Sequence, residues 1–372
     1  LIAQGIIPGI GGILIFIPQI AFLFMFISIL EESGYMSRVV FLMDKIMRKF
    51  GLSGKSIVPL ISGTACAIPA IMATRNIENW KERLITILVT PFTTCSARLP
   101  VYAIIIALVI PDERVFGIIN MQGLTLMLLY LLGFGMAIFS AYILNTILKI
   151  KGKTYFVVEM PNYKLPMFKN VAINVIEKTK AFIFGAGKII LAISIVLWFL
   201  ASYGPGDKFR NAEKIVLEKN LEKPLNTAEL QSAIASQKLE NSYIGLMGKT
   251  IEPVISPLGY DWKIGVAIIS SFAAREVFVG TLATIYSVGD SDNDNTIKNK
   301  MQAEINPETG QKIFNFASGI SLLLFYAFAM QCASTIAITK KETNSWKWPL
   351  GQLIFMSGLA YVVALIAFQI LK

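Results

Sequence analysis

The chain has 372 residues, of which 55% are hydrophobic and only 16% are charged, and its formal net charge is +10. A soluble domain of this size carries more charge on its surface, so the composition excludes that class and indicates a polytopic membrane protein. The positive charge does not indicate a nucleic-acid binder, because the lysines and arginines lie in the connections between apolar segments, where membrane topology places them. The chain begins at Leu1 with no initiator methionine or signal peptide, so we expect it to be part of a longer protein.

Eight apolar segments approach the length of about 20 residues that spans a bilayer. In chain order they are 10–30, 56–74, 83–110, 119–149, 180–203, 263–288, 315–338 and 347–371. Basic residues concentrate in the connections 31–55, 149–180 and 339–347, so the positive-inside rule predicts that these three are cytoplasmic. The long polar stretch 204–262 is then extracytoplasmic.

The second apolar segment, 56–74, is predicted to be a re-entrant hairpin. It lies between two basic stretches, 31–55 and 75–83, which a simple span would place on opposite sides of the membrane. It is also short and interrupted by Pro59 and Pro69, and non-helical backbone at membrane depth is tolerated only inside protein or along a cavity. Segment 263–288 is predicted to be its counterpart, entering from the outer side. The basic, amphipathic stretch 37–51 either transmits motion to the hairpin or anchors on anionic lipid.

An internal repeat supports this organisation. GLSGKSIVPLISGTAC at 51–66 aligns without a gap with GYDWKIGVAIISSFAA at 259–274, and Cys95 in TTCSARL matches Cys332 in MQCASTI. With three spans in each half, the two halves would have opposite orientations in the membrane. Inverted repeats whose broken helices meet near the bilayer midplane are typical of secondary transporters.

The predicted fold is therefore all-α, with two inverted repeats that each contain a re-entrant or broken hairpin and three spans. The division is 1–150 for the first repeat with its gate hairpin at 55–75, 151–180 for a cytoplasmic amphipathic connection, and 181–372 for the second repeat, with an extracytoplasmic insertion at 204–262 and a gate hairpin at 263–288.

The stretch TPFTTCSARLPVY at 90–102 carries polar residues at the centre of an apolar segment. Pro91 removes a backbone donor and frees a carbonyl oxygen near mid-membrane. Cys95 and Arg98 are three residues apart, so they share one helical face. An arginine at this depth needs protein, water or a partner around it, and Glu276 is the predicted partner.

The composition of the apolar segments points to a metal ion. The chain has no histidine and three cysteines, all within apolar segments. Thiolate, thioether and carboxylate groups suit a borderline-to-soft transition metal, although a buried cysteine can also be a plain packing residue. The candidate metal ligands are Cys66, Cys95, Cys332, Glu276, Met330, Gln331 and Ser96, and the candidate gating residues or charge partners are Arg98, Arg275, Pro69 and Pro91.

At these residues the chain resembles the membrane domain of FeoB-type ferrous iron transporters. The matching blocks run in the family's order: EESGYMSRVVFLMDKIMRKFGLSGKS at 31–56, ISGTACAIPAIMATRNIENWKERL at 61–84, TPFTTCSARLPVY at 90–102, AAREVFVGTL at 273–282 and FYAFAMQCASTIAITKKETNSWKWP at 325–349. One departure is Ala67, which stands where the family usually has asparagine.

The resemblance implies a function that the residues alone do not. The substrate would be Fe²⁺, taken up across the bacterial inner membrane by a multi-pass protein whose fold is related to nucleoside transporters. GTP and Mg²⁺ would act only through an N-terminal G domain outside this chain, since GLSGKS at 51–56 lacks the first glycine of a P-loop. The implied partners are membrane lipid, that G domain, a small FeoA-type cytoplasmic protein and further copies of the chain.

Two other classes remain open at this point. A nucleoside or other solute carrier of related architecture would favour hydrogen-bonding side chains over three intramembrane cysteines. A membrane-embedded enzyme would need an acid–base or nucleophilic constellation, which the sequence does not offer, so the chain is expected not to be an enzyme. Both channel-like and alternating transport are compatible with the sequence.

Overall fold

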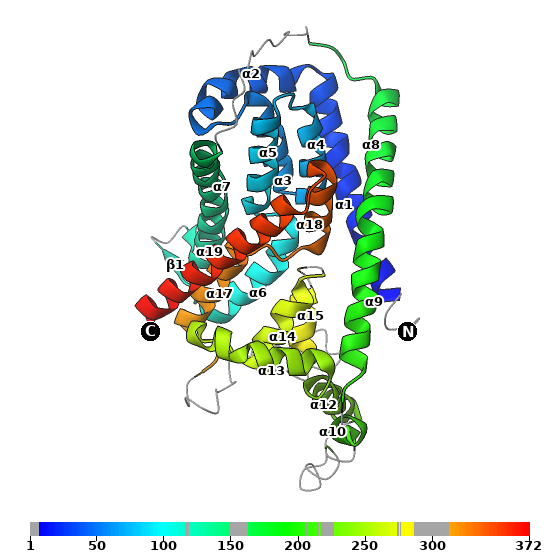
Figure 1. The fold of residues 1–372 in the computed structure, drawn as a ribbon, viewed down its shortest axis with the longest axis vertical. Helices are drawn as coiled ribbons and strands as arrows, with labels where there is room; N and C mark the ends of the chain where they lie inside the picture. The colour runs from blue at the N-terminus through cyan, green and yellow to red at the C-terminus, as the bar shows by residue number, and fades with distance from the viewer. Residues whose placement is uncertain are drawn as a thin grey trace.

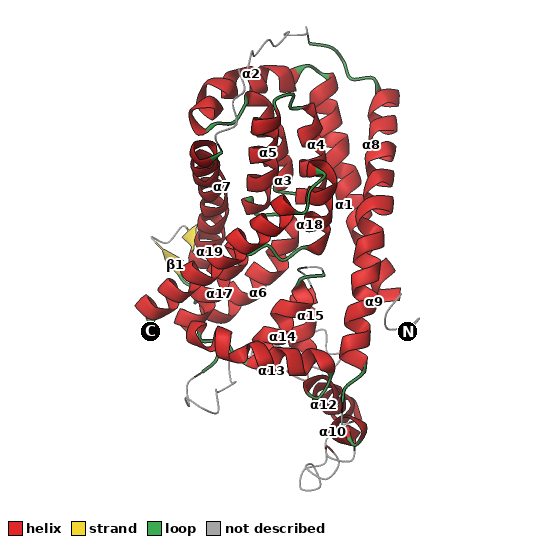
Figure 2. Ribbon diagram, in the orientation of Figure 1, coloured by secondary structure: helices red, strands yellow, loops and turns green. Residues whose placement is uncertain are grey.

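The computed structural model describes residues 7–115, 119–148, 163–205, 207–213, 216, 227–273, 275, 277–285 and 312–372. This part of the chain is almost entirely helical, and its one sheet pairs the two-residue strands β1 (Arg114–Val115) and β2 (Ile119–Asn120) (Figure 2). Five helical runs in it are long and apolar enough to cross a membrane, and a bent pair, 20–32 with 35–50, would make a sixth. The predicted all-α, polytopic membrane fold is confirmed.

The first half begins with α1 (Ile7–Glu32) and α2 (Tyr35–Met47), which lies across one end of the molecule (Figure 1). Gly34 between them has φ +79°, a left-handed conformation that glycine adopts without strain. The two helix axes differ in direction by 84°. The helix α2 exposes Phe41 and Leu42 while it buries Val40, which agrees with the predicted amphipathic stretch 37–51.

A close contact between α2 and the start of the first hairpin gives a testable prediction. The N–H of Gly54 donates to Asp44 Oδ1 at 2.9 Å, and a Cβ at this position would lie 2.2 Å from the carbonyl oxygen of Val40. Gly54→Ala is therefore expected to cost about 1–3 kcal/mol of stability through overpacking, measured as a lower thermal transition. Gly123→Ala is the control, because nothing lies within 4 Å of its Cβ. An equal effect of the two changes would contradict the prediction.

Over the predicted first hairpin, the structure has two short helices with a break between them. The helix α3 (Ile57–Gly63) and the helix α4 (Ala67–Ala73) are separated by 64–66. The segment after it is also broken: α5 (Trp80–Val89) and the 3₁₀ turns Thr90–Phe92 and Ser96–Arg98 precede α6 (Leu99–Val109), and α7 (Met121–Ile147) closes the first half.

The second half also has a long run, an amphipathic helix, short helices with breaks and a final long helix, with further helices between the run and the amphipathic helix. A long helical run comprises α8 (Phe168–Phe182), a π-helical turn over Ile183–Gly187 and α9 (Lys188–Ser202); it is followed by α10 (Asp207–Arg210), α12 (Thr227–Glu240), α13 (Tyr243–Ile255), α14 (Trp262–Ser271), α15 (Val277–Ile285), α17 (Phe316–Phe328), α18 (Ala333–Thr343) and α19 (Lys347–Leu371). The run begins at Phe168, so the connection predicted over 151–180 is already helical in its last part. Residues 149–162 and 286–311 lie outside the described residues.

Two observations support the inverted repeat, which stays a prediction. The amphipathic helix α2 lies at one end of the molecule, and its counterpart α13 lies toward the opposite end, with α12 and α10 beyond it (Figure 1). The two hairpins also turn with the same backbone bonds, at the positions that the sequence alignment pairs. The bonds are Thr64 N–H to Ile61 O and Ala65 N–H to Ser62 O in the first hairpin, and Phe272 N–H to Ile269 O and Ala273 N–H to Ser270 O in the second. The division of the chain into the predicted domains likewise stays a prediction.

Candidate metal-ion path

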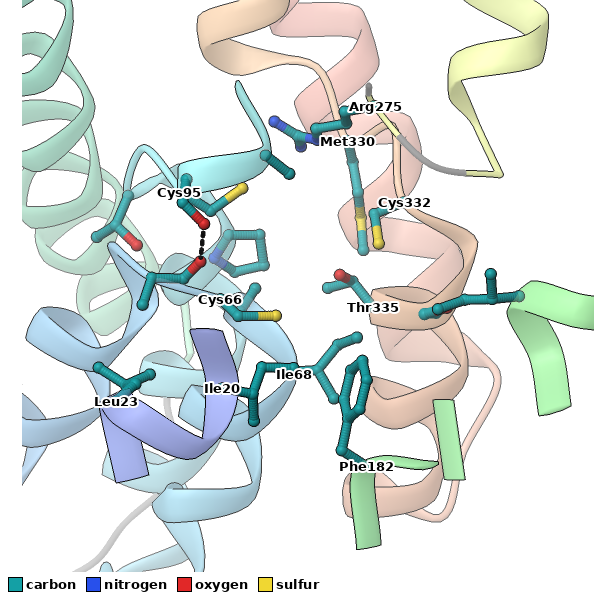
Figure 3. Close-up of a pocket in the computed structure, with 18 of the residues that line it drawn as sticks. Ile20, Leu23, Cys66, Ile68, Cys95, Phe182, Arg275, Met330, Cys332 and Thr335 are labelled. Atoms are coloured by element: carbon teal, nitrogen blue, oxygen red, sulfur yellow. Dashed lines mark hydrogen bonds between the residues drawn. The ribbon is translucent and has the colours of Figure 1, made fainter. Parts of the chain in front are cut away.

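A cavity of about 890 Å³, including its open part, lies between the first hairpin and the second broken span. All three cysteines line it, together with Met330 and Ser96. Figure 3 shows the sulfur atoms of Cys66, Cys95 and Cys332 directed into the space between the two halves. The structure thus brings five of the seven candidate ligands together around one cavity, although they are spread from Cys66 to Cys332 along the chain.

Each cysteine lies at a break in a helix. Cys66, Cys95 and Cys332 have extended backbone, with φ of −156°, −87° and −151° and ψ of 133°, 159° and 103°, and each directly precedes a helical segment. At such a break the side chain is not packed against the preceding helical turn. None of the three forms a disulfide within the described part of the chain, and all are partly exposed, so their sulfur atoms are accessible within the cavity.

The tip of the first hairpin is fixed to the first broken span. Pro69 has no N–H, so a continuous helix would leave the carbonyl of Ala65, four residues before it, unpaired; the helix breaks here instead, and α4 starts only at Ala67. Ser96 pairs with this carbonyl: its N–H and its hydroxyl donate to the Ala65 carbonyl at 3.3 and 2.8 Å. In the second half, Ala333 N–H donates to the carbonyl of Phe272 at 3.1 Å. The breaks at Cys95 and Cys332 are therefore each tied to the tip of one hairpin.

Pro91 frees carbonyls in the same way, and a residue that the sequence analysis missed occupies them. Gln352 of α19 donates from Nε2 to the carbonyls of Ile87 and Leu88 at 3.3 and 2.8 Å. The sequence feature that could have identified Gln352 is its position as a polar residue within an apolar segment. The carbonyl oxygens that Pro69 and Pro91 free are thus hydrogen-bonded within the protein.

Arg98 is completely buried, with 0% of its surface exposed, and it does not line the cavity. Its guanidinium donates to the carbonyls of Pro91, Phe92 and Thr93 at 3.1, 3.3 and 3.5 Å. A cation is stabilised there because the carbonyls at a helix C-terminus carry partial negative charge. Glu276, its predicted partner, lies outside the described residues, so that pairing stays a prediction.

Arg275 and Gln331 lie at the second break. Arg275 lines the cavity and donates from one terminal nitrogen to the carbonyl of Ala329 at 3.1 Å. The Gln331 side chain instead lines a neighbouring, mostly apolar pocket, which meets the cavity at Met330 and Ala273. Both ends of its amide are buried without a hydrogen-bond partner within the described part of the chain.

The candidate ligands do not form one compact site. Among the described residues, no three side chains of cysteine, aspartate or glutamate come together closely enough to hold a single ion. The thiols are instead distributed around the wall of the cavity. This arrangement favours successive, weak contacts with an ion over tight capture, which is what passage requires.

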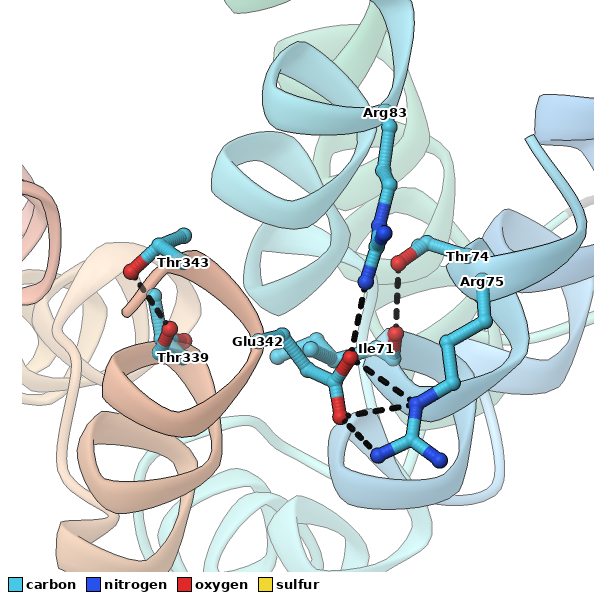
Figure 4. Close-up of polar contacts among 7 residues, drawn as sticks. All are labelled: Ile71, Thr74, Arg75, Arg83, Thr339, Glu342 and Thr343. Carbon is cyan, nitrogen blue, oxygen red and sulfur yellow. Dashed lines mark hydrogen bonds and ion pairs between the residues drawn. The ribbon is translucent and has the colours of Figure 1, made fainter. Parts of the chain in front are cut away.

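A buried carboxylate that the sequence analysis did not select joins the two halves at the other end of the hairpin (Figure 4). Glu342, in the last turn of α18, accepts from Arg75 Nε at 3.0 Å and from Arg83 at 2.8 Å. Its own hydrogen bond to Glu342 raises the pKa of Arg75 above its ordinary value. Within the described residues, these two ion pairs are the only ones that connect the halves. They also place 75–83 and 339–347 at the same end, as the charge pattern predicts.

Family models match most of the chain. The Gate model, described as nucleoside recognition, matches residues 13–109 and 183–346. The chain belongs to the Gate family. A second model, described as the C terminus of ferrous iron transport protein B, matches residues 126–178, between the two parts of the Gate match.

Curated relatives of this Gate-family chain are named Fe(2+) transporter FeoB. The protein from Leptospira interrogans serogroup Icterohaemorrhagiae serovar Lai (strain 56601) is 47% identical over 370 residues, which is 100% of this chain and 50% of the relative. The protein from Staphylococcus aureus (strain MSSA476) is 38% identical over 372 residues, again 100% of this chain and 49% of the relative. A relative from Porphyromonas gingivalis (strain ATCC BAA-308 / W83), named an Fe(2+) transport protein A/Fe(2+) transporter FeoB fusion protein, is 38% identical over 386 residues, covering 100% of this chain and 44% of the relative.

The chain spans about half the length of the curated relatives it matches. The resemblance to the membrane domain of FeoB-type proteins is confirmed, and with it the assignment to a multi-pass membrane protein. The relatives are named as transporters, which is consistent with the expectation that this chain is not an enzyme. No solved structure matches the chain significantly.

Proposed function

We propose that this Gate-family chain forms the path by which Fe²⁺ enters the bacterial cytoplasm across the inner membrane. The observation that carries the proposal is that Cys66, Cys95, Cys332 and the thioether of Met330 come from three separate breaks to line one cavity. Sulfur ligands suit a borderline transition metal better than magnesium or calcium. The names of the relatives support the choice of iron.

Two short half-helices connect this cavity with the charged cluster at Glu342. The helix α4 begins after Cys66 and is followed by Arg75, while α18 begins after Cys332 and contains Glu342 in its last turn. A movement that separates Arg75 from Glu342 would therefore separate the two helices that flank the cavity. We assign this cluster as the cytoplasmic gate of the path. Arg275, Arg98, Pro69 and Pro91 fix the helix breaks around the cavity.

The source of the movement is proposed to be a nucleotide-binding domain outside this chain, which binds GTP with Mg²⁺. The membrane lipid and a small FeoA-type protein are the other proposed partners, and the fusion protein of Porphyromonas gingivalis supports the latter. Assembly into a homo-oligomer is also part of the proposal. The predicted ligand role of Glu276 remains part of the proposed path, although that residue is outside the described part of the chain.

A nucleoside carrier is the second candidate, because the matching family model is described as nucleoside recognition. The cavity favours it less: among the described residues, its polar side chains beside the cysteines are Thr93, Ser96, Arg275, Ser334 and Thr335. Competition of a nucleoside mixture with Fe²⁺ in the same uptake assay distinguishes the two candidates.

Replacement of the cavity thiols tests the iron path. In proteoliposomes containing the full-length protein, with GTP and a reductant, Cys66→Ser, Cys95→Ser and Cys332→Ser are each expected to lower Fe²⁺ uptake about tenfold or more, because each removes a soft ligand. The triple variant is expected to be inactive. Undiminished uptake by the triple variant would show that the cysteines are packing residues.

Two methionines provide a matched control for this experiment. Met330 lines the cavity, whereas Met356 of α19 is completely buried in the core away from it. Met330→Leu should lower uptake and Met356→Leu should not, although both remove one thioether at nearly constant volume. Equal losses would indicate a packing effect.

A further inference from the structure

Both broken spans end a helical stretch inside the membrane region, next to the cavity. The carbonyls at such an end lack helical partners and together carry about half a negative charge. Alignment of the two spans on Cys95 and Cys332 pairs Phe92 with Ala329, each three residues before its cysteine. These two carbonyls therefore hold equivalent positions in the two halves.

An arginine donates to each of these equivalent carbonyls. Arg98 reaches Phe92 at 3.3 Å from within the same span, and Arg275 reaches Ala329 at 3.1 Å from the second hairpin. Two arginines at non-equivalent sequence positions thus each place a positive charge at the equivalent carbonyl of their half. The recurrence indicates that both carbonyl groups require a cation.

The two arginines are held very differently. Arg98 donates to three carbonyls and is shut off from the cavity. Arg275 is 6% exposed, donates to one carbonyl, and lines the cavity beside Met330 and Cys332, where Figure 3 shows it. One of its terminal nitrogens is buried without a partner, and within the described residues it forms no ion pair with a carboxylate. Arg98 is therefore held by three acceptors, whereas Arg275 has only one to leave when it moves.

We infer that Arg275 is a tethered substitute for the transported cation. In the conformation described here its guanidinium donates to the Ala329 carbonyl beside Met330 and Cys332. An entering divalent cation displaces the guanidinium from that carbonyl. This inference rests on the proposed iron path. A carbonyl oxygen, a thioether and a thiol give the mixed oxygen and sulfur donor set that Fe²⁺ accepts. Two positive charges a few ångströms apart in a medium of low dielectric constant repel strongly, so the carbonyl holds one or the other.

The exchange also explains how the ion leaves. A site built to hold Fe²⁺ permanently would oppose transport, because conduction requires binding weak enough for release. When the guanidinium returns to Ala329, it replaces the interaction that the ion loses and repels the ion toward the next thiol. Arg275 thus acts as a positioning residue for the path and weakens binding at this one point.

The test is equilibrium binding of Fe²⁺ to the full-length protein in lipid nanodiscs, under anaerobic and reducing conditions, without nucleotide. Arg275→Gln removes the charge and retains a hydrogen-bond donor, and it is expected to bind Fe²⁺ about tenfold more tightly and to release it more slowly. Arg275→Lys retains the charge and is expected to stay within about threefold of the wild type. Arg114→Gln, at an exposed arginine of the outer connection, controls for a general change in charge.

The outcomes separate the inference from the proposed function. Equal or weaker binding by Arg275→Gln, with thermal unfolding and helical content unchanged, would overturn the inference and leave the iron path intact. If Arg275→Gln does not fold, Arg275→Lys decides: tighter binding despite the retained charge would overturn the inference. Absence of Fe²⁺ binding in the wild type and in both variants would overturn the iron path and the inference together.

Discussion

Replacing both Arg75 and Arg83 by glutamine is expected to destabilise the protein by about 3–5 kcal/mol, the range found when a buried charge loses its partners. The Glu342 side chain is only 3% exposed, so the carboxylate has no access to water once its donors are removed. The reverse change is expected to cost less. In Glu342→Gln the remaining arginines, 51% and 23% exposed, can turn toward solvent. We therefore predict that thermal unfolding in nanodiscs shows a larger loss of stability in the double arginine variant than in Glu342→Gln.

The same variants are expected to open the cavity from the cytoplasmic side. Because α4 and α18 flank the cavity and meet at this cluster, its loss should increase the reactivity of Cys66 and Cys332 toward a membrane-impermeant thiol reagent in inside-out vesicles. Glu78→Gln is the matched control, since it breaks the exposed Lys55–Glu78 pair within one half. Such exposed pairs contribute little. Unchanged thiol reactivity in Glu342→Gln and in the double arginine variant would show that the cluster is no gate.

Arg98→Gln is expected to have the second large effect, a loss of about 3 kcal/mol or more, because several buried carbonyls then lack donors at about 1–3 kcal/mol each. These are the carbonyls of Pro91, Phe92 and Thr93, directly before Cys95. The loss should appear as a lower thermal transition together with reduced Fe²⁺ uptake, since the break that presents Cys95 depends on the same bonds.

Two comparisons define this second prediction. Arg98→Lys keeps a cation near the carbonyls but has no planar fork, so it should recover only part of the stability. Arg114→Gln should be neutral at its exposed position. A thermal transition of Arg98→Gln equal to that of the wild type would mean that water replaces the guanidinium, and that the break does not depend on Arg98.

Local chemistry made much of the fold predictable. Pro59, Pro69 and Pro91 interrupt apolar runs, and helical hydrogen bonding fails where a backbone donor is missing, so the hairpin and the first broken span could be predicted from the sequence. The second broken span has no proline near Cys332. Its prediction depended on alignment with the first span. The early start of the run at Phe168 was missed, because residues 168–180 are too polar to be recognised as part of an apolar segment.

The residues of the candidate site could be predicted from their residue types, but the groups that they contact could not. The cysteines, Met330 and Ser96 stand out in apolar sequence, and the structure gathers them around one cavity. The predicted pairing of Arg98 with Glu276 stays a prediction, but the carbonyl oxygens that Arg98 contacts in the described part of the structure were not foreseen. Every residue carries a carbonyl, so no sequence pattern marks the ones that a distant side chain will reach.

Composition and local pattern were sufficient to identify a multi-pass helical membrane protein with cysteines in interrupted apolar segments. Hydrophobicity, prolines and charge act over a few neighbouring residues, and their effect can be predicted without the fold. The three-dimensional packing was needed to show that Glu342 joins Arg75 and Arg83, that Gln352 donates to the carbonyls before Pro91, and that Arg275 lies against Ala329. Contacts between residues so far apart in the chain depend on how the helices pack, because a buried polar group must find whatever partner that packing places within reach.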